Sequence, residues 1–157
     1  MGIEEDLTLL FRPVVAAVLC GIIGWEREQA GKAAGLRTHM LVGLAAALYI
    51  VAAEVVVARY AAGEYDPDVV RLDPVRVIGE IASGIGFLGA GTIFVAGEKG
   101  VVRGLTTAAS IWATAAIGVV VGIERYVLAL GTTALVLAVL HFLRRFDPDH
   151  PDPAPED

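Results

Sequence analysis

Hydrophobic residues in this chain form five long runs, separated by short segments that carry charges or prolines. Each run holds about 18–23 residues, which as a helix matches a hydrocarbon core of about 30 Å. The runs are continuous rather than alternating, which favours helices over the strands of a membrane barrel. The pattern predicts an all-α membrane protein with five transmembrane helices, at about residues 7–25, 39–57, 74–96, 105–122 and 126–143.

Composition supports the same class of protein. Hydrophobic residues make up 56% of the 157 residues, 18 glycines come in addition, and the mean hydropathy is +0.68. Soluble domains hold about 45–50% apolar residues with glycine included. We therefore expect one transmembrane domain over residues 1–146. The remaining residues, 147–157, alternate proline with acids and are predicted to form a disordered tail.

Charge and cysteine content exclude several classes of function. The net charge of −6 arises largely at the two ends of the chain, and no basic face suits nucleic acid. The acidic N-terminus differs from the basic start of a signal peptide, so the first run is predicted to stay as an anchor. The single Cys20 excludes a disulfide framework and favours a small packing residue. No nucleophile stands beside a base in any motif, so the chain is not predicted to be an enzyme.

Lysine and arginine set the expected orientation. Basic residues are slightly more numerous on the cytoplasmic side of a membrane protein. One side of this chain would carry five, Arg12, Arg59, Arg71, Arg76 and Arg125, and the other seven, Arg27, Lys32, Arg37, Lys99, Arg103, Arg144 and Arg145. This bias predicts an outside N-terminus and a cytoplasmic C-terminus.

An internal similarity suggests a repeat. The segment GKAAGLRTHMLVGLAAAL aligns with GVVRGLTTAASIWATAAI, so that Gly31, Gly35, Leu36 and Thr38 match Gly100, Gly104, Leu105 and Thr107. Runs one–two and three–four would then be two copies in parallel orientation, an arrangement that places sites between halves. The alternative is that helices rich in small residues resemble one another by composition.

Three carboxylates lie within or near the predicted spans. Asp73 and Pro74 have the order of an N-cap and first helical residue, which puts Glu80 about 9 Å along the helix and inside the membrane. Glu54 lies at a similar depth near the end of the second run. Carboxylates in a membrane indicate function by default. Together Glu54, Asp73 and Glu80 would offer oxygen ligands to a hard cation such as Mg²⁺.

A structural role is the favoured alternative for these carboxylates. Arg76 and Glu80 are four residues apart on one helix and can pair, and Arg59 can pair with Glu54. Such pairs would only neutralise buried charge.

Small and hydroxyl residues recur along the third and fourth runs. Stripes of this kind allow two helices to pack closely, which is the simpler interpretation. The alternative is a polar path or broken helix between the two runs. Its candidate residues are Ser83, Gly86, Gly89, Thr92, Thr106, Thr107, Ser110 and Thr114.

Charged residues also cluster on the predicted cytoplasmic side. A solvated loop explains mixed charges, but some of these residues precede helix N-termini and could bind an anion such as a lipid headgroup or phosphate. The cluster comprises Glu26, Arg27, Lys32, Arg37 and Arg103.

Three long segments together resemble one family. They are GWEREQAGKAAGLRTHMLVGLAAAL at 24–48, DPVRVIGEIASGIGFLGAGTI at 73–93 and VRGLTTAASIWATAAIGVVVG at 102–122. In this order they resemble the MgtC/SapB family of bacterial and archaeal inner-membrane proteins. The characteristic positions carried over are Glu26, Arg27, Lys32, Arg37, Thr38, Asp73, Arg76, Arg103, Thr106, Thr107 and Trp112.

The resemblance implies a multi-pass protein of the bacterial or archaeal inner membrane with a role under magnesium limitation. Some members act in virulence and restrain the rotary ATP synthase. A regulator that binds other membrane complexes is therefore expected, with transport of Mg²⁺ or another cation as the alternative. Small-residue faces also make a homodimer an expectation.

Two features differ from the family pattern. That pattern usually has glutamine at the position of Glu80, so a carboxylate there is not a family requirement. Many members also carry a soluble ACT-like domain after the fifth span, whereas this sequence continues into a short acidic tail.

Overall fold

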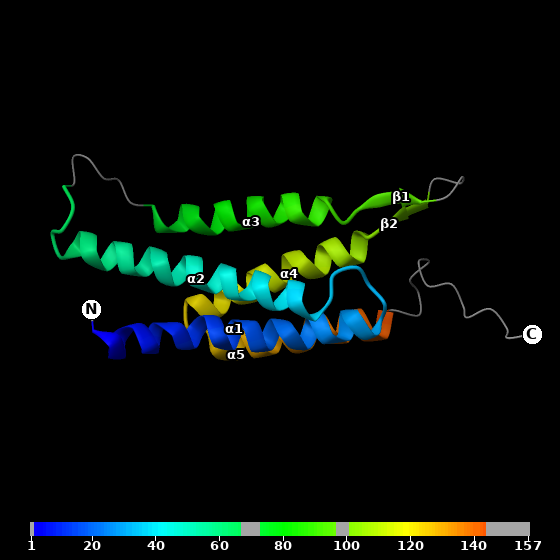
Figure 1. Ribbon diagram of the computed structural model, residues 1–157, viewed down its shortest axis with the longest axis horizontal. Coiled ribbons are helices and arrows are strands. Elements are labelled where there is room, and N and C mark those ends of the chain that lie inside the picture. The colour runs from blue at the N-terminus through cyan, green and yellow to red at the C-terminus, as the bar shows by residue number, and fades with distance from the viewer. Residues whose placement is uncertain (1, 67–72, 97–100, 144–157) are drawn as a thin grey trace, which may run out of the picture.

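The computed structural model describes residues 2–66, 73–96 and 101–143. Five helices run alternately in opposite directions along one long axis (Figure 1). They are α1 Ile3–Gln29, α2 Leu36–Ala61, α3 Pro74–Ala90, α4 Leu105–Gly122 and α5 Tyr126–Phe142. The predicted tail 147–157 lies outside the described residues, as do Arg71, Lys99, Gly100, Arg144 and Arg145.

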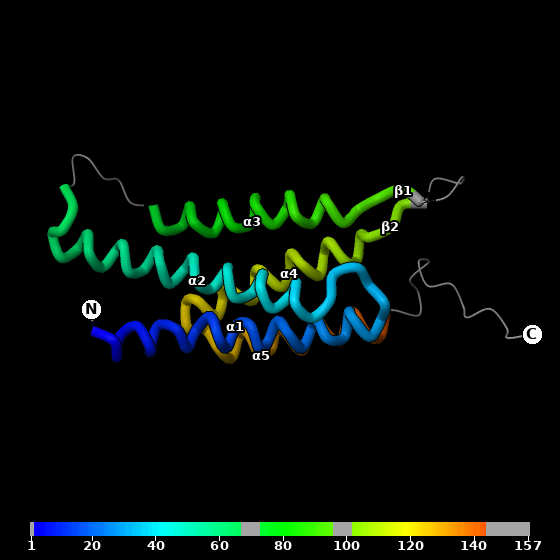
Figure 2. The backbone as a smooth tube through the Cα atoms, in the orientation of Figure 1, coloured from blue at the N-terminus to red at the C-terminus, as the bar shows by residue number. Residues whose placement is uncertain are grey.

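The bundle has two distinct ends. Figure 2 shows the N-terminus at the same end as the close of α2 and the start of α3. The α4–α5 turn faces this end, which we call the N-terminal end. The α1–α2 loop and a β-hairpin lie at the opposite end, which we call the hairpin end.

Helices α1, α2 and α4 form the centre, with the most extensive contact between α1 and α2. α5 packs against α1 and α4, and α3 packs against α4 and, less extensively, α2. Small residues permit this arrangement. A Cβ on Gly43 would overlap the Cys20 sulfur, and a Cβ on Gly118 would overlap the Gly43 carbonyl oxygen. Cys20 is fully buried, as expected for a packing residue.

The third helix is shorter than predicted. The sequence predicts a helix to Ala96, but α3 ends at Ala90. Glycines at 84, 86, 89 and 91 lower helix propensity, and the β-branched residues that follow favour strands. Beyond the helix, β1 Phe94–Ala96 pairs antiparallel with β2 Val101–Arg103. Hydropathy along the sequence does not predict this hairpin.

Gly104 lies between the end of β2 and the start of α4. Its φ is +88°, and a Cβ there would overlap the Thr92 carbonyl oxygen. Both the backbone conformation and the close approach therefore require glycine at this position.

Three helices, α1, α2 and α4, are long and apolar enough to cross a membrane, and α5 is a shorter apolar helix. α3 has 17 residues; Asp73 is its N-cap, and Arg76 and Glu80 lie in its first half. Large apolar side chains face outward from the bundle, such as Phe11, Leu41, Val127 and Leu135, which suits contact with lipid. The structure thus confirms five helices and several candidate spans.

Candidate functional sites at the two ends of the bundle

The N-terminal end is organised around Arg12 of α1. Its side chain is nine-tenths buried and forms an ion pair with Glu54 of α2. A second ion pair joins Arg12 Nη2 to Glu124 Oε1 at 2.6 Å, and Arg12 Nη1 donates to the Gly122 carbonyl oxygen at 3.1 Å. One guanidinium thus ties α1 to α2 and to the α4–α5 turn.

Glu124 has an unusual backbone for its residue type. Its φ is +62°, and it is the one non-glycine residue with positive φ in the described part of the chain. The turn is a Schellman motif, with Glu124 N–H donating to Val121 O and Arg125 N–H to Val120 O. Equivalent turns after α1 and α2 place Gly31 and Gly63 at the same position. Glutamate at a position that favours glycine indicates that its side chain is used.

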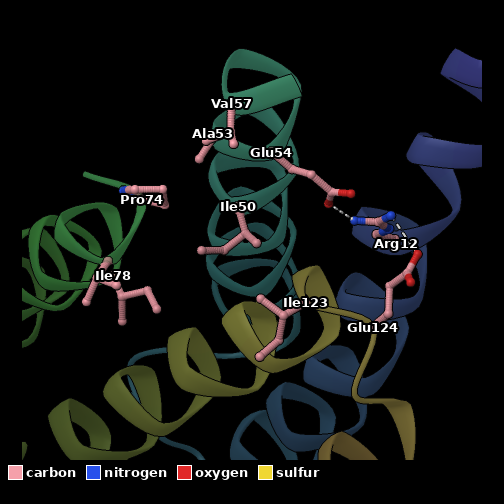
Figure 3. A pocket seen from close by; sticks show the side chains of 10 residues that line it. Arg12, Ile50, Ala53, Glu54, Val57, Pro74, Ile78, Ile123 and Glu124 are labelled. Carbon is pink, nitrogen blue, oxygen red and sulfur yellow. Dashed lines mark hydrogen bonds and ion pairs between the residues drawn. The ribbon is translucent and has the colours of Figure 1, made fainter. Parts of the chain in front are cut away.

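A cleft of about 450 Å³ opens beside this ion-pair network (Figure 3). One wall is charged and consists of Arg12, Glu54 and Glu124. The other wall is apolar and comes from α2, the start of α3 and the end of α4, with Ile50, Ala53, Val57, Pro74, Val75, Ile78 and Ile123.

The three predicted metal ligands do not come together. Asp73 caps α3 by accepting from Arg76 N–H at 3.2 Å, while Glu80 lies 3.4 Å from Arg76 Nε on the exposed helix surface. Glu54 is held by Arg12 instead. Among the described residues, no group of three His, Cys, Asp or Glu side chains could hold a metal ion.

The predicted ion pairs have mixed outcomes. Arg76 and Glu80 do pair, as the spacing of four indicates. The expected Arg59–Glu54 pair is wrong, because Glu54 binds Arg12 and Arg59 lies 3.7 Å from Glu64. Arg59 is the expected partner because it lies near Glu54 on α2, whereas the actual partner, Arg12, is 42 residues away from Glu54 in the sequence.

The substitution Glu80→Gln is expected to leave the free energy of unfolding within about 0.5 kcal/mol, because exposed pairs contribute little. The side chains of Arg76 and Glu80 are 74% and 68% exposed. Thermal unfolding of the purified variant in detergent checks this, with Arg76→Gln as the matched control. Loss of folded protein in the Glu80 variant would show that the ion pair is obligatory.

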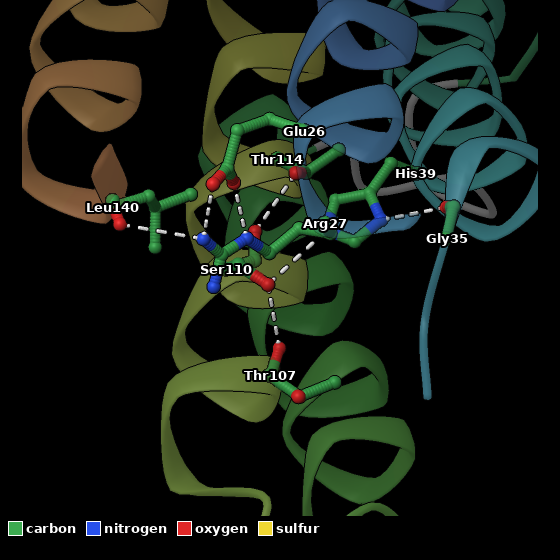
Figure 4. Close-up of polar contacts among 8 residues, drawn as sticks. All are labelled: Glu26, Arg27, Gly35, His39, Thr107, Ser110, Thr114 and Leu140. Carbon is green, nitrogen blue, oxygen red and sulfur yellow. Dashed lines mark hydrogen bonds and ion pairs between the residues drawn. The ribbon is translucent and has the colours of Figure 1, made fainter. Parts of the chain in front are cut away.

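The hairpin end buries a second arginine. Arg27 of α1 is 1% exposed, and its Nε and Nη2 lie 2.5 and 2.7 Å from the two oxygens of Glu26 (Figure 4). Nη2 also donates to the Leu140 carbonyl oxygen of α5 at 3.4 Å. The bidentate pair neutralises Arg27 where α1 meets α5.

A buried polar chain runs beside Arg27. His39 of α2 has no exposed surface; its Nδ1 lies 2.9 Å from Gly35 O and its Nε2 3.1 Å from Ser110 Oγ. With its proton on Nδ1, neutral His39 donates to Gly35 O, while the single hydroxyl proton of Ser110 can point either to Nε2 or to Thr107 O. This chain joins α2 to α4.

The predicted polar path is divided between two faces. Thr107, Ser110 and Thr114 are buried, and the hydroxyls of Ser110 and Thr114 bond carbonyls of their own helix, Thr107 O and Ser110 O, at 2.8 Å. Their contacts reach His39 of α2 and Cys20 of α1 rather than α3.

The remaining residues of the predicted polar path do not join the buried hydroxyls of α4. Ser83, Gly86 and Thr106 are exposed, Gly89 packs against Ala108, and the Thr92 hydroxyl donates to Gly89 O at 2.7 Å. The cleft of about 200 Å³ between α3 and α4 has apolar walls, formed by Ile78, Ile81, Ala82, Trp112, Ala115, Ala116, Val119 and Val120. The structure does not gather the eight predicted residues into one path.

The predicted charged cluster also divides. Glu26 and Arg27 form the buried pair, Arg37 is exposed, and Lys32 and Arg103 each have further interactions. Sequence reasoning missed Glu28, which accepts from Leu36 N–H at 2.8 Å at the start of α2. It also missed Arg12 and Glu124; the available signal was an arginine inside an apolar run.

Apolar helices, outward-facing hydrophobic side chains and buried ion pairs near the two ends define a multi-pass membrane protein. Residues 14–148 match the model of the MgtC family, and the chain belongs to this family.

Three curated proteins from bacteria are similar in sequence to this chain. The chain is 46% identical over 138 residues to "Putative magnesium transporter YhiD" of Escherichia coli (strain K12), covering 85% of this chain and 61% of that protein. It is 42% identical to "Protein MgtC" of Brucella abortus (strain 2308), covering 82% and 48%. It is 40% identical to "Protein MgtC" of Salmonella typhimurium (strain 14028s / SGSC 2262), covering 89% and 56%.

The chain thus spans about half to three-fifths of the length of these relatives. No solved structure shows significant similarity to it.

Proposed function

We propose that this protein is a regulator in the bacterial or archaeal inner membrane that binds other membrane complexes under magnesium limitation. The observation that carries the proposal is the uncovered face of α3. Gly79 and Gly86 have nothing within 4 Å of where a Cβ would lie, and Ser83, on the same face between them, is exposed. Small residues on a helix face allow another membrane helix to approach closely.

The link to magnesium rests on relatives. The name of the E. coli relative describes magnesium transport, and the other relatives are named MgtC. The family resemblance adds the rotary ATP synthase as a candidate partner. A second copy of this chain is another candidate for the α3 face.

The proposed topology has five spans, an outside N-terminus and a cytoplasmic C-terminus. Helices α1 and α2 would be one copy of a parallel two-helix repeat, and α3 and α4 the other. In support, the matched glycines Gly35 and Gly104 both immediately precede a helix, and Leu36 and Leu105 are both first helical residues. Cysteine labelling from either side of the membrane tests the orientation.

Cation transport is the second candidate. The favouring observation is the cleft at the N-terminal end, which presents the carboxylates of Glu54 and Glu124. However, the buried hydroxyls of α4 are bonded within their helix, and the cleft between α3 and α4 is apolar. We therefore propose regulation ahead of transport.

Two measurements separate these functions. Purified protein in liposomes is expected to give Mg²⁺, Na⁺, K⁺ and proton fluxes equal to those of empty liposomes. Crosslinking in native membranes is expected to capture a partner membrane complex, the capture being lost in Gly86→Leu on α3. The matched control Gly131→Leu on α5, also at an open position, should keep the partner. Flux above background together with no captured partner would overturn regulation and favour transport.

A further inference from the structure

The cleft at the N-terminal end is amphipathic. Its charged wall holds Arg12, Glu54 and Glu124, and its apolar wall includes Ala53 and Ile78 (Figure 3). A volume of about 450 Å³ exceeds what one ion or a few waters need. The shape suits a molecule with a polar head and an apolar body.

The charge of the cleft selects among such molecules. Two carboxylates share one guanidinium, so the charged wall has a formal net charge of −1. The described contacts with Arg12 use Glu54 Oε2 and Glu124 Oε1, which leaves the other oxygen of each carboxylate to accept hydrogen bonds. These side chains are 54% and 57% exposed, so their free oxygens can be reached.

Arg12 itself is not available to a ligand. It is 8% exposed, and its nitrogens already contact both carboxylates and the Gly122 carbonyl oxygen. An anionic headgroup would therefore meet the carboxylates rather than the guanidinium. A Mg²⁺ ion in the cleft would contact only two carboxylates, both already paired with Arg12, beside an apolar wall.

We propose that this cleft binds a phospholipid whose headgroup carries a primary ammonium. The ammonium donates to the free oxygens of Glu54 and Glu124, and the apolar wall contacts the start of an acyl chain. The presence of glutamate in the left-handed position of the α4–α5 turn agrees with this role, because glycine there would remove one of the two acceptors. The proposal is independent of whether the protein regulates or transports.

Native mass spectrometry of the full chain in detergent tests the proposal. Phosphatidylethanolamine and phosphatidylcholine with identical acyl chains are titrated separately, because they differ only in the methyl groups that remove the ammonium donors. We expect about tenfold tighter binding of phosphatidylethanolamine, as for charge-assisted hydrogen bonds. Equal binding of the two lipids, or tighter binding of phosphatidylglycerol, would overturn the proposal.

Variants locate the site. Glu54→Gln and Glu124→Gln together are expected to remove the preference for phosphatidylethanolamine, while Glu80→Gln, on the exposed surface of α3, should keep it. Should the double variant fail to fold, Ala53→Phe places a large side chain in the cleft and leaves the charged residues in the chain, and it is expected to weaken binding of phosphatidylethanolamine. A preference that persists in the folded double variant, or binding unchanged by Ala53→Phe, would place the lipid elsewhere.

Discussion

Replacing Gly118 with valine is expected to lower the free energy of unfolding by about 3 kcal/mol, at the upper end of the range for overpacked cores. A Cβ at this position would overlap the carbonyl oxygen of Gly43 and lie 2.8 Å from Ala46 Cβ. A backbone carbonyl cannot rotate away as a side chain can. The helices α2 and α4 must therefore move apart, which also loosens the contacts of Ile117 and Val121 in the core.

The melting temperature of the purified protein in a mild detergent measures this effect. Gly131→Val on α5 is the matched control, because it has the same change of residue inside a helix but no atoms within 4 Å of its Cβ. It should melt near the original protein. Equal melting of the Gly118 and Gly131 variants would show that close approach of α2 and α4 does not stabilise the bundle.

The substitution Arg27→Met is expected to lower the free energy of unfolding by about 3 kcal/mol, because it leaves a partly buried carboxylate without its partner. The Arg27 side chain is 2% exposed and that of Glu26 is 18% exposed, so Glu26 can recover only part of its hydration. The Leu140 carbonyl oxygen also loses a donor.

A double-mutant cycle isolates the ion pair from the packing of Arg27. Adding Glu26→Gln to Arg27→Met removes the unpaired charge and is expected to restore more than half of the lost stability, as judged by unfolding in detergent. If the double variant is no more stable than Arg27→Met, the loss is due to packing rather than charge. The same cycle at Arg76 and Glu80 should show almost no coupling, because both side chains are exposed.

Hydrophobic run length predicted α4 and α5 closely, since α4 spans the residues expected and α5 ends one residue earlier, whereas α1 and α2 extend three or four residues beyond the predicted runs at each end. The end of α3 could not be predicted in the same way. Residues such as Ile93 and Val95 are apolar in a membrane helix and in a strand alike, so hydropathy alone does not distinguish the two. The glycines before them are the available signal, and from the sequence alone they indicate either packing positions or a break in the helix.

The sites depend on contacts that sequence spacing does not specify. Arg76 and Glu80 are four residues apart on one helix, and this pair was predicted. Arg12 and Glu54 come from different helices, so their pairing depends on how α1 and α2 pack. The hydroxyl stripe of α4 was visible in the sequence, but only the packed structure shows that Ser110 faces His39 rather than α3.

The buried arginine of α1 also bears on how the chain enters a membrane during synthesis. Glu54 emerges from the ribosome 42 residues after Arg12, and Gly122, which accepts from the same guanidinium, 110 residues after it. Until Glu54 has been made, Arg12 has no partner among its contacts in the folded protein and must remain in contact with water or headgroups. The contacts of Arg12 are complete only after α4 and the following turn have been made, so this end of the bundle is finished late in synthesis.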